Sequence, residues 1–427
     1  MGGDMVAALG RATLDGVTLF GSNCRRRGDQ LPTLHRSAGR SHAPEERIDA
    51  GGTGVPQLRE THTAVGVQTR GKWGYHHGVN SLGVAAACSR MRTRLDRESP
   101  GLRGPDLVRL MLERAHSARQ AVDLATDLIR RHGQGDDAAS GACDSTFLIA
   151  DGLEAFVLET AGRHWVYQEV RQVRAVSDTS TVRQDWDGVA PGFAGFAIDN
   201  GWWPADGSKV DFGGVVAPSP NPDAMRRWGR ATLLLEEQNG HIDLAFIRRL
   251  LSDHYEGSPD EADPIRRRGG PSPLCPHGDH GDAVTIGASL AVHLGGTGPL
   301  RVAWFCPGSP CIGVYLPVLL VGDLDEAYGG AIAGVFDRLG SLHLALGRKR
   351  PAWDMARDTL SRLQARFDQE AQEFAEQFNM LVDPREMCRR ATLFMRHALE
   401  RFGETVDGLL TRKSRPAVSQ TSAVAPH

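Results

Sequence analysis

The order of strand and helix patterns along the chain is the feature that most limits its fold. Apolar runs typical of strands follow one another in blocks, and patterns typical of helices do the same. A regular alternation of the two would predict a parallel sheet, so this order instead predicts antiparallel sheets covered by helices, the α+β class. The strand blocks comprise 4–22, 83–88, 145–180, "AVTIGASLAVHL", "LRVAWFC" and "GVYLPVLLV"; the helical segments comprise 105–132, 223–237, 243–254, 353–381 and 384–411.

The first block has the signature of a β-hairpin. Two short apolar runs, 4–9 and 17–22, flank the pair Asp15-Gly16, a common two-residue turn between strands. A second Asp-Gly pair lies within 145–180, which predicts an antiparallel meander there. Residues 26–62 are rich in Arg, Gly, Pro and His, and we expect them to form a long surface excursion.

The first helical block carries its own start and stop signals. Pro105 suits the first turn of one helix. Ser117 followed by Gln120 predicts the N-terminus of the next, and Gly133 predicts its end.

Composition and charge exclude several classes of protein. The 427 residues carry a net charge of −3, which gives no reason to expect nucleic acid or an anionic membrane as a partner. No apolar run is long enough for a transmembrane helix, and a secretory signal is not expected. The seven cysteines form no regular framework, which favours free thiols in the cytoplasm.

Four stretches in this order carry a resemblance to a known family: "DMVAALGRATLDGVTLFGSN", "WGYHHGVNSLGVA", "GPDLVRLMLERAHSARQAVDLATDLIRRHGQG" running into "STFLIADGLEAFVLETAGRHW", and "CPHGDHGDAVTIGASLAV" running into "PGSPCIGVYLPVLL". The chain resembles the secernins and the related bacterial cysteine dipeptidases, which are N-terminal nucleophile hydrolases. The resemblance implies a four-layer αββα sandwich of two antiparallel sheets without a cofactor. We expect this domain over 1–345, C-terminal helices packed on it over 346–412, and a disordered tail over 413–427.

The resemblance also implies a mechanism. Such enzymes hydrolyse a peptide or amide bond with the thiol of their first mature residue, while its own α-amino group, or a nearby water, takes the proton. Amide donors hold the oxyanion, and an acid near the end of the second strand orders the amine. Similar proteins begin this strand with Cys-Asp, where the present chain has Gly3-Asp4. Glycine has no side chain, so Gly3 cannot attack a carbonyl.

The end of the second strand departs from the family pattern as well. Similar proteins have Asn-Ser-Asp-Arg where this chain has Asn23-Cys24-Arg25-Arg26. Asn23 is retained, but Arg25 replaces the acid and would repel an ammonium group.

Two amide positions complete the expected site. Asn80 in "GVNSLGV" is retained and is expected to donate to a carbonyl oxygen. Asp178 stands where similar proteins have a second asparagine, and an ionised carboxylate only accepts hydrogen bonds. With Gly3 and Arg25, this predicts a pseudoenzyme that binds a small peptide, an amide-like ligand or a partner.

Two other functions stay open. Cys24 lies in the first hairpin, so a working peptidase or amidohydrolase with a relocated nucleophile is one alternative. A scaffold or homo-oligomer is the other, since the C-terminal helices carry an apolar stripe. The stripe comprises Leu360, Leu363, Phe367, Phe374 and Phe378.

Some side chains are candidates for contact with a ligand. His76 and His77 precede Asn80 and are candidates to line a pocket, although solvated loop histidines are the more common case. The family has an arginine near the pocket, which makes Arg226 or Arg230 a candidate for a substrate carboxylate.

Two cysteine-containing stretches remain. "CPHGDHGD" offers metal-ligand types, namely Cys275, His277, Asp279, His280 and Asp282. No second ligand pair with regular spacing is evident, so no metal site is predicted. "CPGSPC", which runs from Cys306 to Cys311, is interpreted as a turn with two buried thiols.

Overall fold

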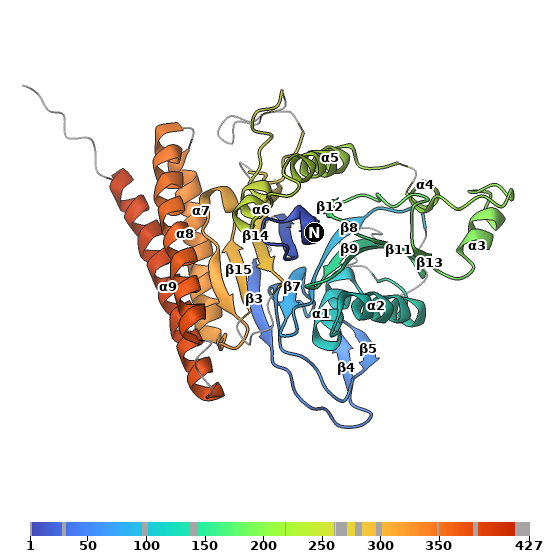
Figure 1. The fold of residues 1–427 in the computed structure, drawn as a ribbon, viewed down its shortest axis with the longest axis horizontal. Coiled ribbons are helices and arrows are strands. Elements are labelled where there is room, and N and C mark those ends of the chain that lie inside the picture. Colours follow the sequence, from blue (N-terminus) through green and yellow to red (C-terminus); the bar gives the residue numbers. More distant parts are fainter. Residues whose placement is uncertain are drawn as a thin grey trace, which may run out of the picture.

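The computed structural model describes most of the chain, and two antiparallel sheets form its centre (Figure 1). The described residues are 2–27, 31–95, 101–135, 144–217, 219–259, 261, 271–277, 284–295, 301–347, 350–378 and 383–414.

Six described strands form the first sheet, with the N-terminal hairpin in its interior. Their spatial order is β12 (Val173–Val176), β1 (Gly3–Ala8), β2 (Leu19–Arg27), β14 (Val284–His293), β15 (Val302–Pro307) and β16 (Leu316–Leu319). β1 and β2 pair as predicted, with Gly3 opposite Cys24 and Ala8 opposite Leu19. The predicted two-residue turn at Asp15-Gly16 is wrong, because residues 9–18 join the strands through a longer loop that contains the 3-10 turn Gly10–Ala12. Every residue of β1 is buried. β12 and β2 pair with its two edges, and strands of the second sheet and a helix of the outer layer pack against it from outside the first sheet.

Eight described strands form the second sheet. Their order is β13 (Gly188–Val189), β11 (His164–Glu169), β10 (Ala155–Ala161), β9 (Asp144–Ala150), β8 (Ala85–Met91), β7 (His77–Asn80), β6 (Ala64–Thr69) and β3 (Pro32–Ser37). The predicted meander is confirmed for β9, β10 and β11, whereas β12 crosses to the first sheet.

The surface excursion predicted for residues 26–62 is wrong in part. β2 extends to Arg27, β3 pairs with β6 at the edge of the second sheet, and β4 (Arg47–Ala50) forms a small hairpin with β5 (Thr53–Pro56). An edge strand tolerates proline and charged side chains, so its composition resembles that of a loop.

Helices complete the outer layers. α1 (Gly104–Arg114) and α2 (Ala118–His132) cover the second sheet, while α5 (Pro222–Glu237) and α6 (Leu244–Leu251) cover the first. The sheets face each other through β1, β12, β8 and β9, which gives four layers in the order αββα. The N-terminus lies between these two helical layers (Figure 1). As predicted, the Ser117 hydroxyl caps α2 and Gly133 ends it with a φ of 71°.

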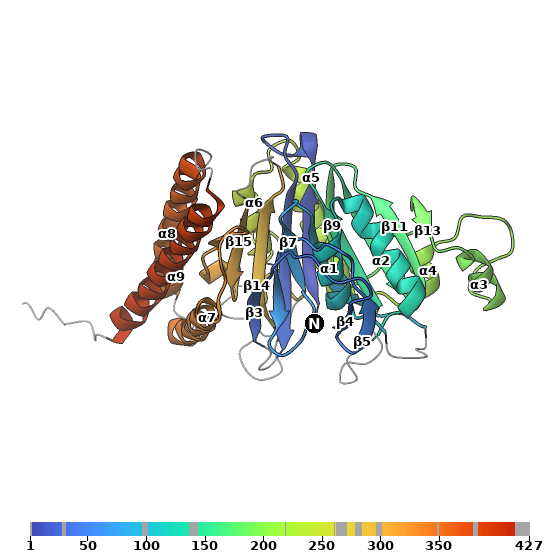
Figure 2. The same cartoon turned by 90° about the horizontal axis from the view of Figure 1, so that it is seen from below.

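Three further helices lie together at one end of the molecule (Figures 1 and 2). They are α7 (Glu326–Leu346), α8 (Arg350–Phe378) and α9 (Pro384–Ser414). α8 and α9 confirm the predicted C-terminal helices, whereas α7 was not predicted. Two shorter helices, α3 (Phe193–Asp199) and α4 (Phe212–Val216), follow β13.

The apolar stripe of α8 packs within this chain. Leu360, Phe367 and Phe378 are buried, and Phe374 stacks on Phe394 of α9 at 4.7 Å between ring centroids. The stripe is therefore not exposed for self-association. The predicted disordered tail lies outside the described residues from 415 onward. Within the described part of the chain, no helix combines the length and hydropathy needed to cross a bilayer.

Candidate functional site

Gly3 begins β1 at a position that has no space for a side chain. A Cβ atom at Gly3 would lie 2.3 Å from the backbone oxygen of Asn23, far closer than carbon and oxygen approach without a bond. The Gly3 amide donates to Ser89 Oγ and to Asp178 Oδ1, both at 3.0 Å. The position expected to carry a nucleophile is thus a closely packed backbone segment.

Asp4 is the centre of a buried charge network next to this glycine. Its carboxylate accepts from Arg25 Nε at 3.0 Å and from Arg227 Nε at 2.9 Å, and the Ser177 hydroxyl also donates to it. Arg227 Nη2 reaches Asp178 Oδ2 at 2.7 Å. Burial by itself would raise the pKa of Asp4, but the two arginines and the hydroxyl outweigh it and hold this pKa below its ordinary value.

Two of the altered positions therefore have partners within the fold. Arg25 pairs with Asp4 and donates to Ser272 Oγ at 3.1 Å and to the Pro273 carbonyl. Asp178 accepts from the Gly3 amide and from Arg227. We name Gly3, Asp4, Arg25, Asp178 and Arg227 the strand-1 site. Its two guanidinium and two carboxylate groups balance in charge.

Both retained asparagines are already engaged in internal hydrogen bonds. Asn80 Nδ2 donates to two carbonyls at the end of α1, Leu112 and Ala115, and its Oδ1 accepts from two backbone amides. Asn23 Nδ2 donates to the carbonyls of Leu251 and Leu274. Neither side chain has an amide hydrogen left for an oxyanion.

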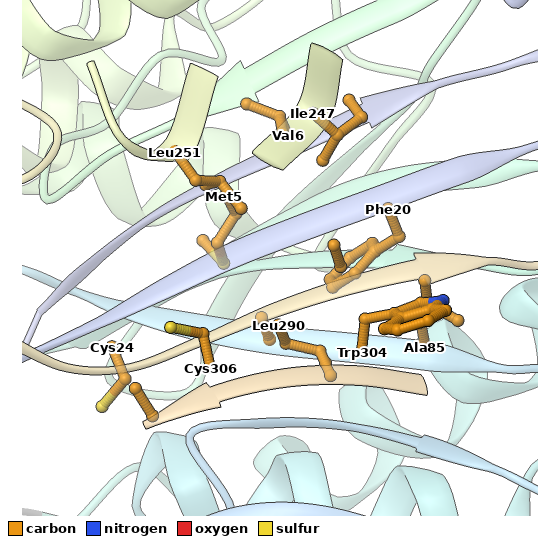
Figure 3. Close-up of a cluster of buried hydrophobic side chains, with 14 of the residues drawn as sticks. Met5, Val6, Phe20, Cys24, Ala85, Ile247, Leu251, Leu290, Trp304 and Cys306 are labelled. Carbon is orange, nitrogen blue, oxygen red and sulfur yellow. The ribbon is translucent and has the colours of Figure 1, made fainter. Parts of the chain in front are cut away.

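Cys24 lies opposite Gly3 but is a poor nucleophile. It is 3% exposed and belongs to the apolar core (Figure 3). Burial raises the pKa of Cys24 to about 12, and the nearby Asp178 carboxylate acts in the same direction. Burial also raises the pKa of Cys88, the other thiol near this position. Attack on a carbonyl requires a thiolate, and neither group forms one readily.

The two histidine candidates lie in β7 and just before it. His77 Nδ1 lies 3.0 Å from Ser22 Oγ of the facing sheet, and burial lowers the pKa of His77 to about 3. His76 Nε2 lies 3.0 Å from Thr69 Oγ1. His77 is thus a neutral ring between the sheets.

The arginine that reaches the strand-1 site is one that the sequence interpretation missed. Arg226 is exposed, and Arg230 pairs with Asp253 at 2.7 Å. Arg227, 2% exposed, lies between them and makes the contacts to Asp4 and Asp178. The sequence could have predicted that Arg227 is buried, because it shares helical spacing with the apolar residues of the buried face of α5. This face comprises Ala224, Arg227, Ala231 and Leu235.

A second group of polar side chains gathers beyond the end of α6. His254, Cys275, His277 and Cys311 place their ligand atoms within 4.8 Å of one another. The sequence shows no second ligand pair with regular spacing, and for that reason no metal site was predicted. The fold supplies a pair without regular spacing, because it brings His254 and Cys311 to Cys275 and His277. Asp279, His280 and Asp282 lie outside the described residues. We name these four side chains the His/Cys cluster.

No protein-family model matches the chain. Several solved structures are similar to it at low sequence identity. Penicillin V acylase from Agrobacterium tumefaciens is 14% identical with a TM-score of 0.43, over 76% of this chain and 89% of that one. A mutant conjugated bile acid hydrolase from Clostridium perfringens is 12% identical with a TM-score of 0.40, over 71% and 89%.

An N-acylethanolamine-hydrolyzing acid amidase ortholog from Caenorhabditis elegans is 11% identical with a TM-score of 0.35, over 69% and 94%. The α+β architecture of this chain is similar to that of all three structures. At TM-scores below 0.5, the likeness supports no correspondence between individual residues.

Proposed function

We propose that this chain is a hydrolase-fold protein of the N-terminal nucleophile type that binds a ligand or partner without hydrolysing it. The secernins and cysteine dipeptidases are the family that its sequence resembles. The observation that carries the proposal is the closed backbone at Gly3, where a Cβ would lie 2.3 Å from the Asn23 oxygen. A nucleophile cannot be placed there unless the hairpin moves.

The surrounding network supports a structural role for the former catalytic position. Asp4 and Asp178 each contact Arg227, and Arg25 occupies the other side of Asp4. The only partly exposed member of these pairs is the Asp178 side chain, at 18%. The partly exposed carboxylate of Asp178 would attract an amine group of a ligand, such as the amino end of a small peptide.

Hydrolysis and binding can be tested on the same samples. Purified protein is incubated with a panel of dipeptides and N-acyl amides, and released amine is quantified. We expect no release above that of a Cys24→Ala variant, together with measurable heat of binding for at least one dipeptide by calorimetry. Turnover that disappears in Cys24→Ala or Cys88→Ala would overturn the proposal.

A relocated nucleophile is the second candidate, and the register that places Cys24 opposite Gly3 favours it. Against it stands the raised pKa of the buried thiol. Intact-mass analysis after a thiol-directed substrate analogue tests it directly. An adduct on Cys24 under native conditions would establish this alternative, and labelling only after denaturation would reject it.

We also propose that the protein works in a reducing compartment such as the cytoplasm. The six cysteines of the described residues are all free, which is usual where thiols are kept reduced.

A further inference from the structure

The His/Cys cluster joins three separate chain segments around one point. His254 follows α6, Cys275 and His277 lie in the segment 271–277, and Cys311 lies in the short 3-10 turn Pro310–Ile312 after β15. His254 and Cys275 are fully buried, while His277 and Cys311 are half-buried. The four residues thus converge from distant parts of the sequence.

The contacts inside the cluster outnumber the hydrogen bonds that their central atom can make. His277 Nε2 lies 3.0 Å from His254 Nε2, 3.1 Å from Cys311 Sγ and 3.9 Å from Cys275 Sγ. One ring nitrogen makes only one hydrogen bond along its axis, as donor or as acceptor. Three groups nevertheless crowd this one atom. Within the described residues, the buried Nδ1 atom of His277 has no hydrogen-bond partner.

A carboxylate fixes the orientation of His254. Its Nδ1 lies 3.0 Å from Glu256 Oε1, and its backbone amide donates to Glu256 Oε2 at 2.6 Å. A ring that donates Nδ1–H to a carboxylate presents the lone pair of Nε2 in the opposite direction. Histidines that bind metals are usually held in this way. Here that lone pair is directed at His277 and the two sulfurs.

The spacing of the ligand atoms suits a tetrahedral ion. Zinc binds histidine nitrogen at about 2.0–2.1 Å and cysteine sulfur at about 2.3 Å, so tetrahedral ligand atoms lie ~3.3 to ~3.8 Å apart. The distances from His277 Nε2 range from 3.0 to 3.9 Å, which brackets these values. Both cysteines are free thiols rather than a disulfide.

We propose that His254, Cys275, His277 and Cys311 bind a single zinc ion in a structural Cys2His2 site. Two thiolates neutralise the divalent ion, so a neutral unit is buried. All four positions are supplied by the protein, which is the arrangement of structural rather than catalytic zinc. His343 of α7 stacks on His277 at 4.9 Å, and Trp353 of α8 meets its edge at 5.7 Å. These rings cover one side of the site.

The position of the cluster indicates what the ion would hold together. The segment that carries Cys275 also provides the acceptors for two side chains of β2. Arg25 donates to Ser272 and Pro273, and Asn23 donates to the carbonyl of Leu274. The zinc ion would therefore hold in place the segment 271–277, which contacts the end of β2. This inference is independent of whether the chain hydrolyses amides.

Metal content of the full-length reduced protein tests the proposal without any substrate. Mass spectrometry of the metal in protein purified without chelators is expected to give about one zinc per chain. Removal of zinc and titration with Co²⁺ is expected to give the visible bands of a tetrahedral site and a thiolate-to-cobalt charge-transfer band. These two readouts require no variant, so a folding defect cannot obscure them.

Variants assign the ligands. Cys311→Ser is expected to lose the charge-transfer intensity of one thiolate and to bind zinc at least about tenfold more weakly. Cys388→Ser makes the same chemical change in α9 and is expected to leave both readouts unchanged. The proposal is overturned if the reduced wild-type chain takes up neither zinc nor cobalt. Equal metal loss in the two variants, or a Cys275–Cys311 disulfide in freshly isolated protein, would also overturn it.

Discussion

The strand-1 site and the His/Cys cluster both bury polar groups next to the end of β2, but they satisfy them differently. In the strand-1 site each donor faces an acceptor, as Arg25 and Arg227 do on opposite sides of Asp4. In the cluster, one ring nitrogen and two sulfurs crowd His277 Nε2, which can make only one hydrogen bond. The first arrangement is complete within the chain, whereas the proposed zinc ion would complete the second. Whether a group of buried polar residues needs a ligand thus depends on whether its donors and acceptors match, and not on the residue types alone.

The largest effect is expected from breaking the strand-1 site at Arg227. Arg227→Met leaves Asp4 and Asp178 without their shared cation in a buried setting, which typically costs about 3–5 kcal/mol. The free energy of unfolding from urea titration measures this loss. Arg226→Met, at the exposed neighbouring position, is expected to change it by less than about 0.5 kcal/mol. Equal effects in the two variants would show that the network does not stabilise the fold.

A smaller loss is expected at Gly3. Gly3→Ala forces a Cβ against the Asn23 oxygen, and overpacking of this kind costs about 1–3 kcal/mol. Gly229→Ala is the matched control, because no atom other than those of its chain neighbours and its own helix backbone lies within 4 Å of its Cβ position in α5. This control should stabilise the helix by about 0.5–1 kcal/mol. An unchanged unfolding midpoint in Gly3→Ala would mean that the hairpin adjusts and that a nucleophile could be accommodated.

The connection between the two regions can be measured through metal release. Arg25→Met removes the donors to Ser272 and Pro273 beside Cys275, so zinc transfer to a chromogenic chelator should quicken about tenfold. The number of zinc ions bound per chain is expected to stay the same, and Arg226→Met should release zinc at the wild-type rate. Identical rates in all three proteins would show that the two regions are independent.

The smallest effect is the contribution of His77 to pH dependence. The unfolded chain binds a proton on this ring near pH 6.5, whereas the folded chain does so only near pH 3. Stability is therefore lost as the pH falls below 6.5, by about 1 kcal/mol between pH 7.5 and 5.5. His77→Gln should flatten this part of the profile of unfolding free energy against pH, and His116→Gln, at an exposed position, should not. A profile that is equally steep in His77→Gln would contradict the assignment.

Local signals predicted much of the fold. The antiparallel pairing of the first two strands and the cap at Ser117 follow from nearby residues, and both are present. The loop of residues 9–18 between the strands is longer than the Asp15-Gly16 pair predicts. β3 was missed because its burial comes from β6, far along the chain, while its own residues are those of an edge strand. α7 was missed because its glycines disfavour a helix, although packing against α9 and β3 compensates for them.

The sequence predicted the candidate site only where the identity of one residue is sufficient. Glycine at position 3 has no side chain, so the absence of a nucleophile there follows from the sequence alone. The partners of Arg25 are not visible, because Ser272 and Pro273 reach it only through the fold. The His/Cys cluster was missed for the same reason, since His254 and Cys311 lie far from Cys275 with no regular spacing.

The interior position of the first hairpin has a consequence for biosynthesis. β2 ends at Arg27, yet its outer neighbour β14 begins only at Val284, and β12, which covers β1, begins at Val173. The ribosome therefore releases an apolar hairpin with two unpaired edges long before either neighbouring strand has been made. Such edges template aggregation. The hairpin therefore completes its pairing only after the chain has been synthesised through β14, which ties its final placement to residues more than half the chain away.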